Sequence, residues 1–152
     1  MNIRFQPIGC VHSPYKTLQD LATRRKNGRV KIEKTEGSLE IFPEFEEGLN
    51  DIDGFSHLII IFAFHQSSSG SLCAHPPHDH KKRGVFSTRS PHRPNPLGMT
   101  IVELVKREGN ILKVAGIDMI NDTPILDIKP YTPRDLKEGA RFGWLEEHLK
   151  NT

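Results

Sequence analysis

The sequence predicts a small, mainly β protein of one domain: a β-barrel or a strongly bent mixed sheet, with short helices, a C-terminal helix and no Rossmann sheet. The chain has 152 residues, the usual length of a single domain. Its β-prone segments are numerous, short and separated by turn residues, as in small barrels. No glycine-rich phosphate-binding motif follows any of them, so a Rossmann or P-loop domain is poorly supported.

The expected strands follow one another along most of the chain. In order, they cover residues 5–12, 38–42, 55–65, 84–88, 99–106, 111–116 and 123–129. The segment 55–65 is the strongest, because its β-branched and aromatic residues form an almost continuous apolar run, which is typical of a strand buried on both faces. Glu108, Gly109 and Asn110 separate two of the segments and predict a hairpin turn.

Helical patterns are weaker and fewer. Residues 43–49 favour one or two helical turns, opened by a proline at the first position. In the tail from Pro133, the spacing of Phe142, Leu145 and Leu149 predicts an amphipathic C-terminal helix. Trp144 lies one residue off that apolar stripe, which favours packing or an interface contact over chemistry. We therefore divide the chain into a barrel of residues 1–135 and a helical tail of residues 136–152.

Charge is unevenly distributed, although the net charge is only +2. A basic cluster near the N-terminus and another in the middle of the chain are separated by an acidic run. If the basic clusters converge on one face, that face has the charge to bind a nucleic-acid backbone; otherwise they are two solvated surfaces. Their members are Arg24, Arg25, Lys26, Arg29, Lys31 and Lys34 in the first cluster, and Lys81, Lys82, Arg83, Arg89 and Arg93 in the second.

Cellular location is inferred from what the sequence lacks. No apolar run approaches the roughly 20 residues of a membrane span, and the first residues do not resemble a signal peptide. Cys10 and Cys73 are too few for a disulfide framework. We expect a cytoplasmic protein without a membrane partner.

The most unusual segment is the loop of residues 83–98, which combines three arginines, a histidine, an asparagine and three prolines. Such polar side chains are costly to bury without partners, and the prolines prevent a regular helix or central strand. A surface loop with solvated charges is one interpretation. The other is a stiff loop that holds cationic side chains against an anionic or carboxylate-bearing ligand.

Two other chemistries are weakly supported. Cys73, His75, His78 and His80 are potential zinc ligands, but a Pro-Pro pair interrupts them, residues 67–80 have the composition of a mobile loop, and no second ligand pair has zinc-like spacing. We expect no native metal site there. Ser87, Thr88 and Ser90 lie near His92 without a nucleophile elbow, so covalent catalysis is not expected either.

The segment 118–131 places polar residues after a turn. Residues 121–124 form the turn, and beyond it Asp127, Lys129 and Tyr131 alternate on one side of a strand. A carboxylate, an ammonium and a phenol in one row form either a ligand-facing surface or a structural ion pair between Asp127 and Lys129. The pattern alone does not separate these two interpretations.

Taken together, these segments are distinctive, and the chain resembles the TsaA-like family, which contains the TrmO-type tRNA methyltransferases. The resemblance extends over roughly residues 5–135, and its central motif is long and specific. The matching segments are residues 12–15 (HSPY), 54–58 (GFSHL), 64–66 (FHQ), 84–98 (GVFSTRSPHRPNPLG) and 122–131 (DTPILDIKPY).

The resemblance implies a β-barrel that binds S-adenosylmethionine without a Rossmann sheet, usually as a homodimer. It implies methylation at N6 of N6-threonylcarbamoyladenosine next to the tRNA anticodon, so that the anticodon loop is the expected partner. Two alternatives stay open. One is a non-catalytic RNA-binding β-barrel, and the other is a metal-dependent hydrolase that uses the Cys73, His75, His78 and His80 loop.

The resemblance also assigns site residues. It implies cofactor contacts from the end of the long strand, the central motif, the following strand and the segment after the turn, namely Phe64, His65, Gln66, Arg89, Ile101, Thr123, Pro124, Ile125, Leu126 and Asp127. Asp127, Tyr131 and Arg93 are the catalytic candidates, with Asp127, Tyr131 or His65 as base and Arg89 or Arg93 holding the threonyl carboxylate. Thr23, Arg24 and Arg25 stand where relatives have Pro-Arg-Gln in an N-terminal cofactor loop.

Overall fold

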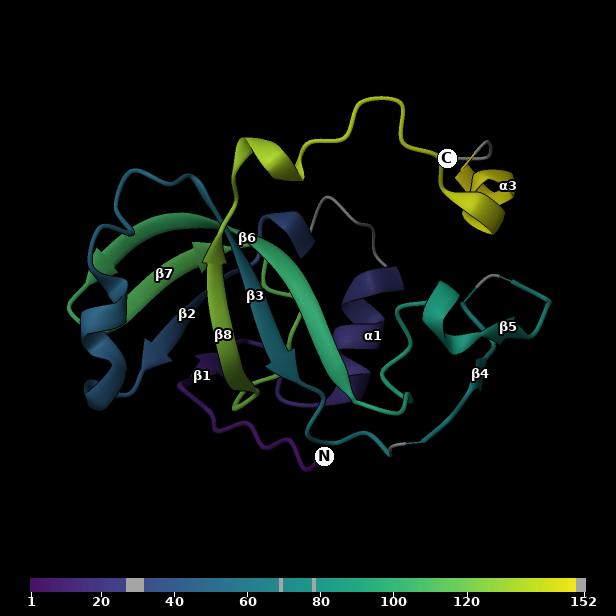
Figure 1. Ribbon diagram of the computed structural model, residues 1–152, viewed down its shortest axis with the longest axis horizontal. Helices are drawn as coiled ribbons and strands as arrows, with labels where there is room; N and C mark the ends of the chain where they lie inside the picture. The colour runs from purple at the N-terminus through teal and green to yellow at the C-terminus, as the bar shows by residue number, and fades with distance from the viewer. Residues whose placement is uncertain (27–31, 69, 78, 150–152) are drawn as a thin grey trace.

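The protein is a closed antiparallel barrel (Figure 1), as a computed structural model shows for residues 1–26, 32–68, 70–77 and 79–149. The strands follow the order β1-β2-β7-β6-β3-β8 around the barrel, which confirms the mainly β fold without a Rossmann sheet. Among the described residues, no helix has the length and apolar character to span a membrane. The barrel strands are β1 (Gly9–His12), β2 (Glu36–Ile41), β3 (His57–Ala63), β6 (Leu97–Glu108), β7 (Ile111–Ala115) and β8 (Pro124–Pro130).

Strand β3 is buried on one face, and the expectation of burial on both faces was wrong. Leu58, Ile60 and Phe62 point into the core, whereas Ile59 and Ile61 lie on the outer face and are half-buried. A closed barrel has one interior, so alternate side chains of a strand must point outward. The apolar run is continuous because the outward residues of β3 are also apolar.

The hairpin between β6 and β7 confirms the expected turn at residues 108–110. Gly109 adopts a positive φ of 62°, which a glycine tolerates without strain. At the other end of β6, Gly98 lies against the rings of Phe62 and Phe64, where a Cβ atom would clash. These two rings pack edge to face with centroids 5.0 Å apart, so the missing side chain at Gly98 makes room for an aromatic pair at the mouth of the barrel.

A helix absent from the sequence-based prediction, α1 (Leu18–Lys26), contains the residues expected in an N-terminal loop. Thr23 and Arg25 therefore lie on a helix, a correction to the loop expected there. The helix begins at a reciprocal cap, in which the Thr17 N–H donates to Asp20 Oδ2 and the Asp20 N–H donates to Thr17 Oγ1, both at 3.1 Å. Leu21 is the buried anchor and packs with Tyr15 and Ile120.

Of the two shorter elements, one agrees with expectation and one differs from it. Residues 43–49 form a 3₁₀ helix, η1 (Pro43–Leu49), as the pattern indicated. The strand expected over 84–88 ends at once: β5 (Arg83–Gly84) pairs only with β4 (Cys73–Ala74), and η2 (Val85–Ser87) follows it. The Ser87 hydroxyl donates to the Gly84 carbonyl at 2.8 Å and closes this turn, which a strand could not accommodate.

The C-terminal helix expected in the tail is formed, but it is short and its apolar stripe is not buried. The tail contains η3 (Pro133–Asp135), η4 (Gly143–Leu145) and α3 (Glu146–Leu149), joined by irregular chain. Gly139 and Gly143 adopt positive φ angles of 70° and 53°, which end any continuous helix. Phe142, Leu145 and Leu149 are 55%, 44% and 47% exposed, so the apolar stripe has no core to pack against. The tail arches away from the barrel, and α3 lies near the β4–β5 ribbon (Figure 1).

Candidate functional site

Three adjoining hollows open on one side of the barrel, and together they form what we call the groove. All three are lined by Arg25 of α1, Arg89 of the central loop and Asp118 of the segment between β7 and β8. The inner hollow reaches under α1, the middle hollow follows the central loop, and the outer hollow lies over β6. The groove therefore joins four segments that are far apart in the sequence.

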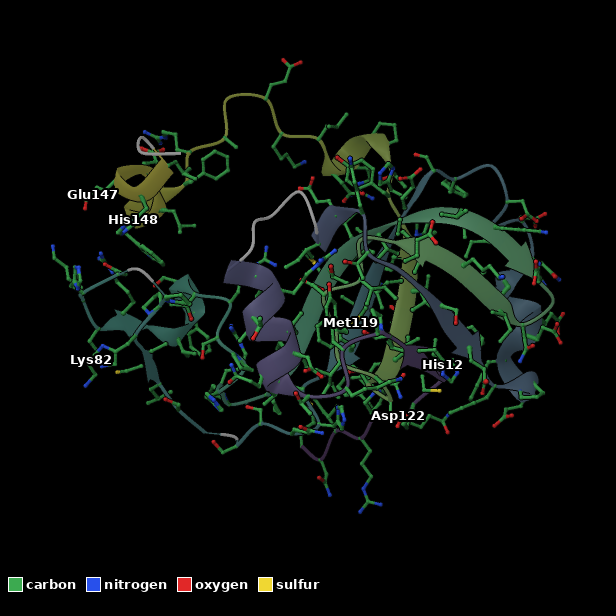
Figure 2. The ribbon with its side chains drawn as sticks, turned by 180° about the vertical axis from the view of Figure 1, so that it is seen from behind. His12, Lys82, Met119, Asp122, Glu147 and His148 are labelled. Carbon is green, nitrogen blue, oxygen red and sulfur yellow. The ribbon has the colours of Figure 1, made fainter. Side chains whose placement is uncertain are left out.

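The inner hollow is mainly apolar and brings together several of the predicted cofactor residues. Met119, which is 2% exposed, lies where α1 meets the barrel (Figure 2). An apolar lining with a few polar side chains is typical of small-molecule sites. The predicted residues found here are Phe64, His65, Gln66, Arg89 and Thr123.

The middle hollow is bounded by the central loop, and internal hydrogen bonds hold that loop in shape. Arg93 Nη1 donates to the Thr88 and Ser90 carbonyls at 2.9 and 3.2 Å. The Ser67 hydroxyl donates to the Pro91 carbonyl at 2.9 Å and bonds with the His92 ring. Arg93 thus lines the groove and also fixes the loop that carries Arg89.

The outer hollow lies over the exposed face of β6. Its lining includes Ile101, which is 44% exposed, together with Met99 and Thr100 on the same strand. His57 at the start of β3 also lines it. The structure therefore places Ile101 in the groove, but away from the inner hollow that holds His65 and Gln66.

The turn before β8 is held rigidly against the N-terminal motif. Asp122 adopts a positive φ of 67°, and the neighbouring Asn121 accepts a hydrogen bond from the Ser13 N–H at 3.0 Å. Thr123 is buried, and its hydroxyl donates to the Ile120 carbonyl at 2.7 Å. These bonds fix Thr123 at the edge of the inner hollow.

The residues after Thr123 leave the groove. Ile125 is fully buried in the barrel core, while Pro124 and Leu126 are half-buried along β8. Asp127 lines a separate hollow beside η1 and forms an ion pair with Lys129 at 2.8 Å. Of the two interpretations of this polar row, the structural ion pair is the one observed.

Tyr131 also lies outside the groove of a single chain. Its N–H donates to the His57 carbonyl at 3.1 Å, and the two rings meet edge to face with centroids 6.2 Å apart. The pairing of β3 with β8 contains a register shift, because Ile61 faces Asp127 but Phe62 faces Ile125. This shift interrupts the simple alternation that the sequence indicated.

The charged centre of the groove is the Asp118 carboxyl between two arginines. Arg25 Nη2 donates to the Asp118 backbone carbonyl at 3.5 Å. Burial raises the pKa of the Asp118 carboxyl, and the positive charges of Arg25 and Arg89 only partly oppose this. One carboxyl oxygen, Oδ1, is buried without a hydrogen-bond partner among the described residues. Such an unsatisfied acceptor is suited to a donor group on a bound ligand.

Comparison with known proteins identifies the family. The model of the tRNA-methyltransferase O N-terminal domain family matches residues 10–135. The chain belongs to this family. The resemblance inferred from the motifs is thereby confirmed, and all the residues that line the groove lie within the matched range.

Relatives of this tRNA-methyltransferase O family member are named either as S-adenosyl-L-methionine-binding proteins or as tRNA methyltransferases. A probable S-adenosyl-L-methionine-binding protein from Pyrococcus abyssi is 45% identical over 97% of this chain and 78% of its own length. The tRNA (adenine(37)-N6)-methyltransferase of Escherichia coli is 37% identical over 87% of this chain and 59% of its own length. The crystal structure of TrmO from Pseudomonas aeruginosa has a TM-score of 0.75 at 35% identity, covering 95% of this chain and 63% of that one. The chain thus spans about three-fifths of the latter two proteins.

In this tRNA-methyltransferase O domain, sequence reasoning missed two residues of the groove. Arg25 was assigned to an uncertain loop, and Asp118 was read only as part of a turn region. No local signal identified Asp118, because its neighbours Ile117 and Met119 are buried and successive side chains of an extended chain point to opposite sides. The signal for Arg25 was the capping pattern of Thr17 and Asp20, which predicts a helix.

The cysteine and histidine loop of this family member does not gather its ligands. Cys73, His75 and His80 are exposed. Within the described part of the chain, these three do not bring their ligand atoms within reach of one metal ion. His78 lies outside the described residues.

Proposed function

We propose that this protein transfers a methyl group from S-adenosylmethionine to N6 of a threonylcarbamoylated adenosine at position 37 of tRNA. The observation that carries this proposal is the convergence of the family motifs on one groove. His65 and Gln66, Arg89, and Thr123 come from three distant motifs and line the same apolar hollow. The names of the relatives as S-adenosylmethionine-binding proteins and tRNA methyltransferases support the proposal.

The inner hollow fits the chemical groups of the cofactor. S-adenosylmethionine supplies a methyl group activated by a sulfonium centre, and it carries an adenine ring, an ammonium and a carboxylate. The apolar lining beside Phe64 suits the adenine, and Asp118 Oδ1 is an acceptor without a partner in the described residues. Arg25 and Arg89 are the neighbouring groups suited to a carboxylate.

The protein then has to position the substrate adenine and remove a proton. Arg89 is exposed at the junction of all three hollows and is suited to hold the threonyl carboxylate. His65 lines the inner hollow and is the base candidate present in a single chain. Asp127 and Tyr131 do not line the groove of one chain, so a catalytic role for either depends on a second copy of the protein.

We also propose a homodimer formed through the outer face of β3 and β6. Cross-strand pairs join Ile59 to Ile101 and Ile61 to Met99 on this face. Met99 and Ile101 are 42% and 44% exposed, an apolar surface that a partner would cover. Both residues also line the groove, so a second copy seated there would border the site.

Three further assignments follow from the proposed activity. The anticodon loop is single-stranded, so its adenine can be turned outward without opening a duplex. A cytoplasmic location is consistent with two free cysteines, Cys10 and Cys73. The end of the family match at residue 135, five residues after β8, supports a barrel unit of residues 1–135 followed by a tail of residues 136–152.

The first experiment is thermal unfolding with and without S-adenosylmethionine. Ligand at about 100 times its Kd should stabilise the protein by about 2.7 kcal/mol. Arg89→Ala should reduce the shift, whereas Arg141→Ala, an exposed arginine in the tail, should leave it unchanged.

Methyl transfer is then measured on tRNA with and without the threonylcarbamoyl group. Transfer to the modified tRNA alone supports the proposal. Salt-sensitive tRNA binding without a cofactor shift would replace it with a non-catalytic RNA-binding barrel. Activity lost on chelation, without cofactor dependence, would replace it with a metal-dependent hydrolase.

A further inference from the structure

We propose that Cys10, His12 and Glu40 form a binding site for a divalent cation of the zinc type on the outer surface of the barrel. None of the three lines the groove, so the inference is independent of the proposed function. Among the described residues, they are the group of cysteine, histidine and acidic side chains whose ligand atoms lie close enough to share one ion.

The β-ladder places the three side chains together. Cys10 and His12 are two residues apart on β1, so their side chains point to the same face of the strand. Glu40 on β2 is the direct cross-strand partner of Cys10. Directly opposed residues of antiparallel strands have Cβ atoms about 4.5–5.5 Å apart, which is within reach of one shared ion. The scaffold is thus set by backbone pairing and not by flexible loops.

The distances between the ligand atoms match those around a tetrahedral zinc ion. With bonds of about 2.3 Å to sulfur and about 2.0–2.1 Å to nitrogen and oxygen, neighbouring ligand atoms lie about 3.3–3.6 Å apart. His12 Nε2 lies 3.2 Å from Glu40 Oε1 and 3.8 Å from Cys10 Sγ. All three atoms lie within 4.8 Å of one another. Small rotations of these side chains are enough to bring the three atoms around one ion.

The surrounding charge also favours a cation. The carboxylates of Glu40 and Asp122 both act electrostatically on Cys10, so the local charge is negative. His12 and Asp122 lie on the same side of the barrel (Figure 2). A soft thiolate with an imidazole and a carboxylate is a donor set that selects zinc over calcium or magnesium. Water is available as the fourth ligand.

Binding would release the thiol proton and connect β1 to β2. Because β1 also pairs with β8, the ion would brace the seam where these strands close the barrel. The expected consequence is a higher unfolding temperature in the presence of zinc, by mass action on the folded state. Methyl transfer is expected not to require the ion.

The test is a titration of the untagged full-length protein with Co²⁺, followed by competition with Zn²⁺. The expected result is one equivalent of bound cobalt with a thiolate charge-transfer band, displaced by zinc. Cys10→Ser should abolish the band, and Glu40→Gln should weaken cobalt binding at least about tenfold. Cys73→Ser is the matched control, because it removes the other thiol and should leave the spectrum unchanged.

Metal-free unfolding temperatures establish that each variant is folded. His12→Gln provides a second test at a side chain that is 46% exposed and therefore tolerant of replacement. A wild-type protein without the thiolate band would overturn the proposal. A band that survives Cys10→Ser would also overturn the proposal. A band that disappears in Cys73→Ser would overturn it as well, because that result would assign the ion to the loop around Cys73.

Discussion

Asp118 shows at the scale of one residue how a binding site can oppose stability. Burial raises the pKa of this carboxyl above its ordinary value of 3.8, so the folded state holds the proton more tightly than the unfolded chain. The ionised carboxylate therefore disfavours folding, increasingly as pH rises from the unfolded value through the folded one. A cofactor group that donates to Asp118 would offset this cost, which is the pattern expected of a functional group.

Asp118→Asn should consequently be more stable than the wild type near neutral pH and bind S-adenosylmethionine less tightly. A lost charged hydrogen bond corresponds to an affinity decrease of roughly tenfold or more. Thermal unfolding as a function of pH and calorimetric titration measure the two effects. The stability difference should shrink toward acidic pH, where both proteins are neutral at this position. Lower stability with unchanged binding would show that Asp118 is only structural.

Gly98 is a second residue at which the neighbours dictate the side chain, because they leave no space for a Cβ atom. A methyl group there would clash with the rings of Phe62 and Phe64, and Phe62 is held by the core. Gly98→Ala should therefore destabilise the protein by about 1–3 kcal/mol. Gly84→Ala is the control, because its Cβ would meet nothing within 4 Å and its φ of −61° suits any residue. Equal effects of the two changes in denaturant unfolding would contradict this account.

At the scale of elements, the tail is attached to the β4–β5 ribbon by a small polar cluster. Trp144 Nε1 donates to the Ser87 carbonyl at 2.9 Å, and the Arg83 guanidinium lies 4.9 Å from the centre of the indole ring. Asp79 accepts from Arg83 Nε at 2.7 Å and lies 3.5 Å from His148 Nε2. Figure 2 shows His148 on the short helix that ends the described chain.

This cluster predicts an acid-sensitive attachment. The hydrogen bond from Arg83 lowers the pKa of Asp79 from 3.8 to about 2. The contact is therefore present above the unfolded value and is lost as pH falls through the folded one. Fluorescence of Trp144, the single tryptophan, should shift to the red over that acidic range.

Asp79→Asn should produce the same spectral shift near neutral pH, because it removes the charge that holds Arg83 under the indole ring. Asp135→Asn is the control, since that carboxylate caps η3 by accepting a hydrogen bond from the Thr132 N–H. Far-UV circular dichroism distinguishes release of the tail from global unfolding. An unchanged tryptophan spectrum in Asp79→Asn would show that the indole contact alone holds the tail.

The elements also show what local sequence patterns can and cannot predict. The β6–β7 hairpin was predictable because Gly109 and two alternating strands are adjacent in the chain. Helix α1 was missed because it has one buried anchor, Leu21, and depends on a cap more than on an apolar stripe. The apolar spacing predicted the C-terminal helix, but it did not show that the helix would be short, because Gly139 and Gly143 adopt positive φ angles just before it.

At the scale of the whole molecule, the sequence predicted the barrel but only some of the residues that line its groove. The motifs identified His65, Arg89 and Thr123, which are side chains that line the inner hollow. The contact of Arg25 with Asp118 joins positions 93 residues apart, and no local pattern contains it. The ion pair of Asp127 with Lys129 was one of the two interpretations that the local pattern left open. The hollow that Asp127 lines could not be predicted in this way, because its other wall is the distant η1.

The last prediction concerns the assembly. Met99 and Ile101 lie on the exposed face of β6 and border the groove, so a dimer through this face would bury them. A buried carboxylate without a partner is costly, so Met99→Glu and Ile101→Glu together should convert a dimer to a monomer. Analytical ultracentrifugation measures the change, and Leu136→Glu, at a 66% exposed position in the tail, is the control. A wild-type protein that is monomeric at micromolar concentration would exclude the dimer. A folded monomeric variant that binds S-adenosylmethionine normally but no longer methylates tRNA would show that the second copy completes the catalytic site. That result would explain why Asp127 and Tyr131 lie outside the groove of one chain.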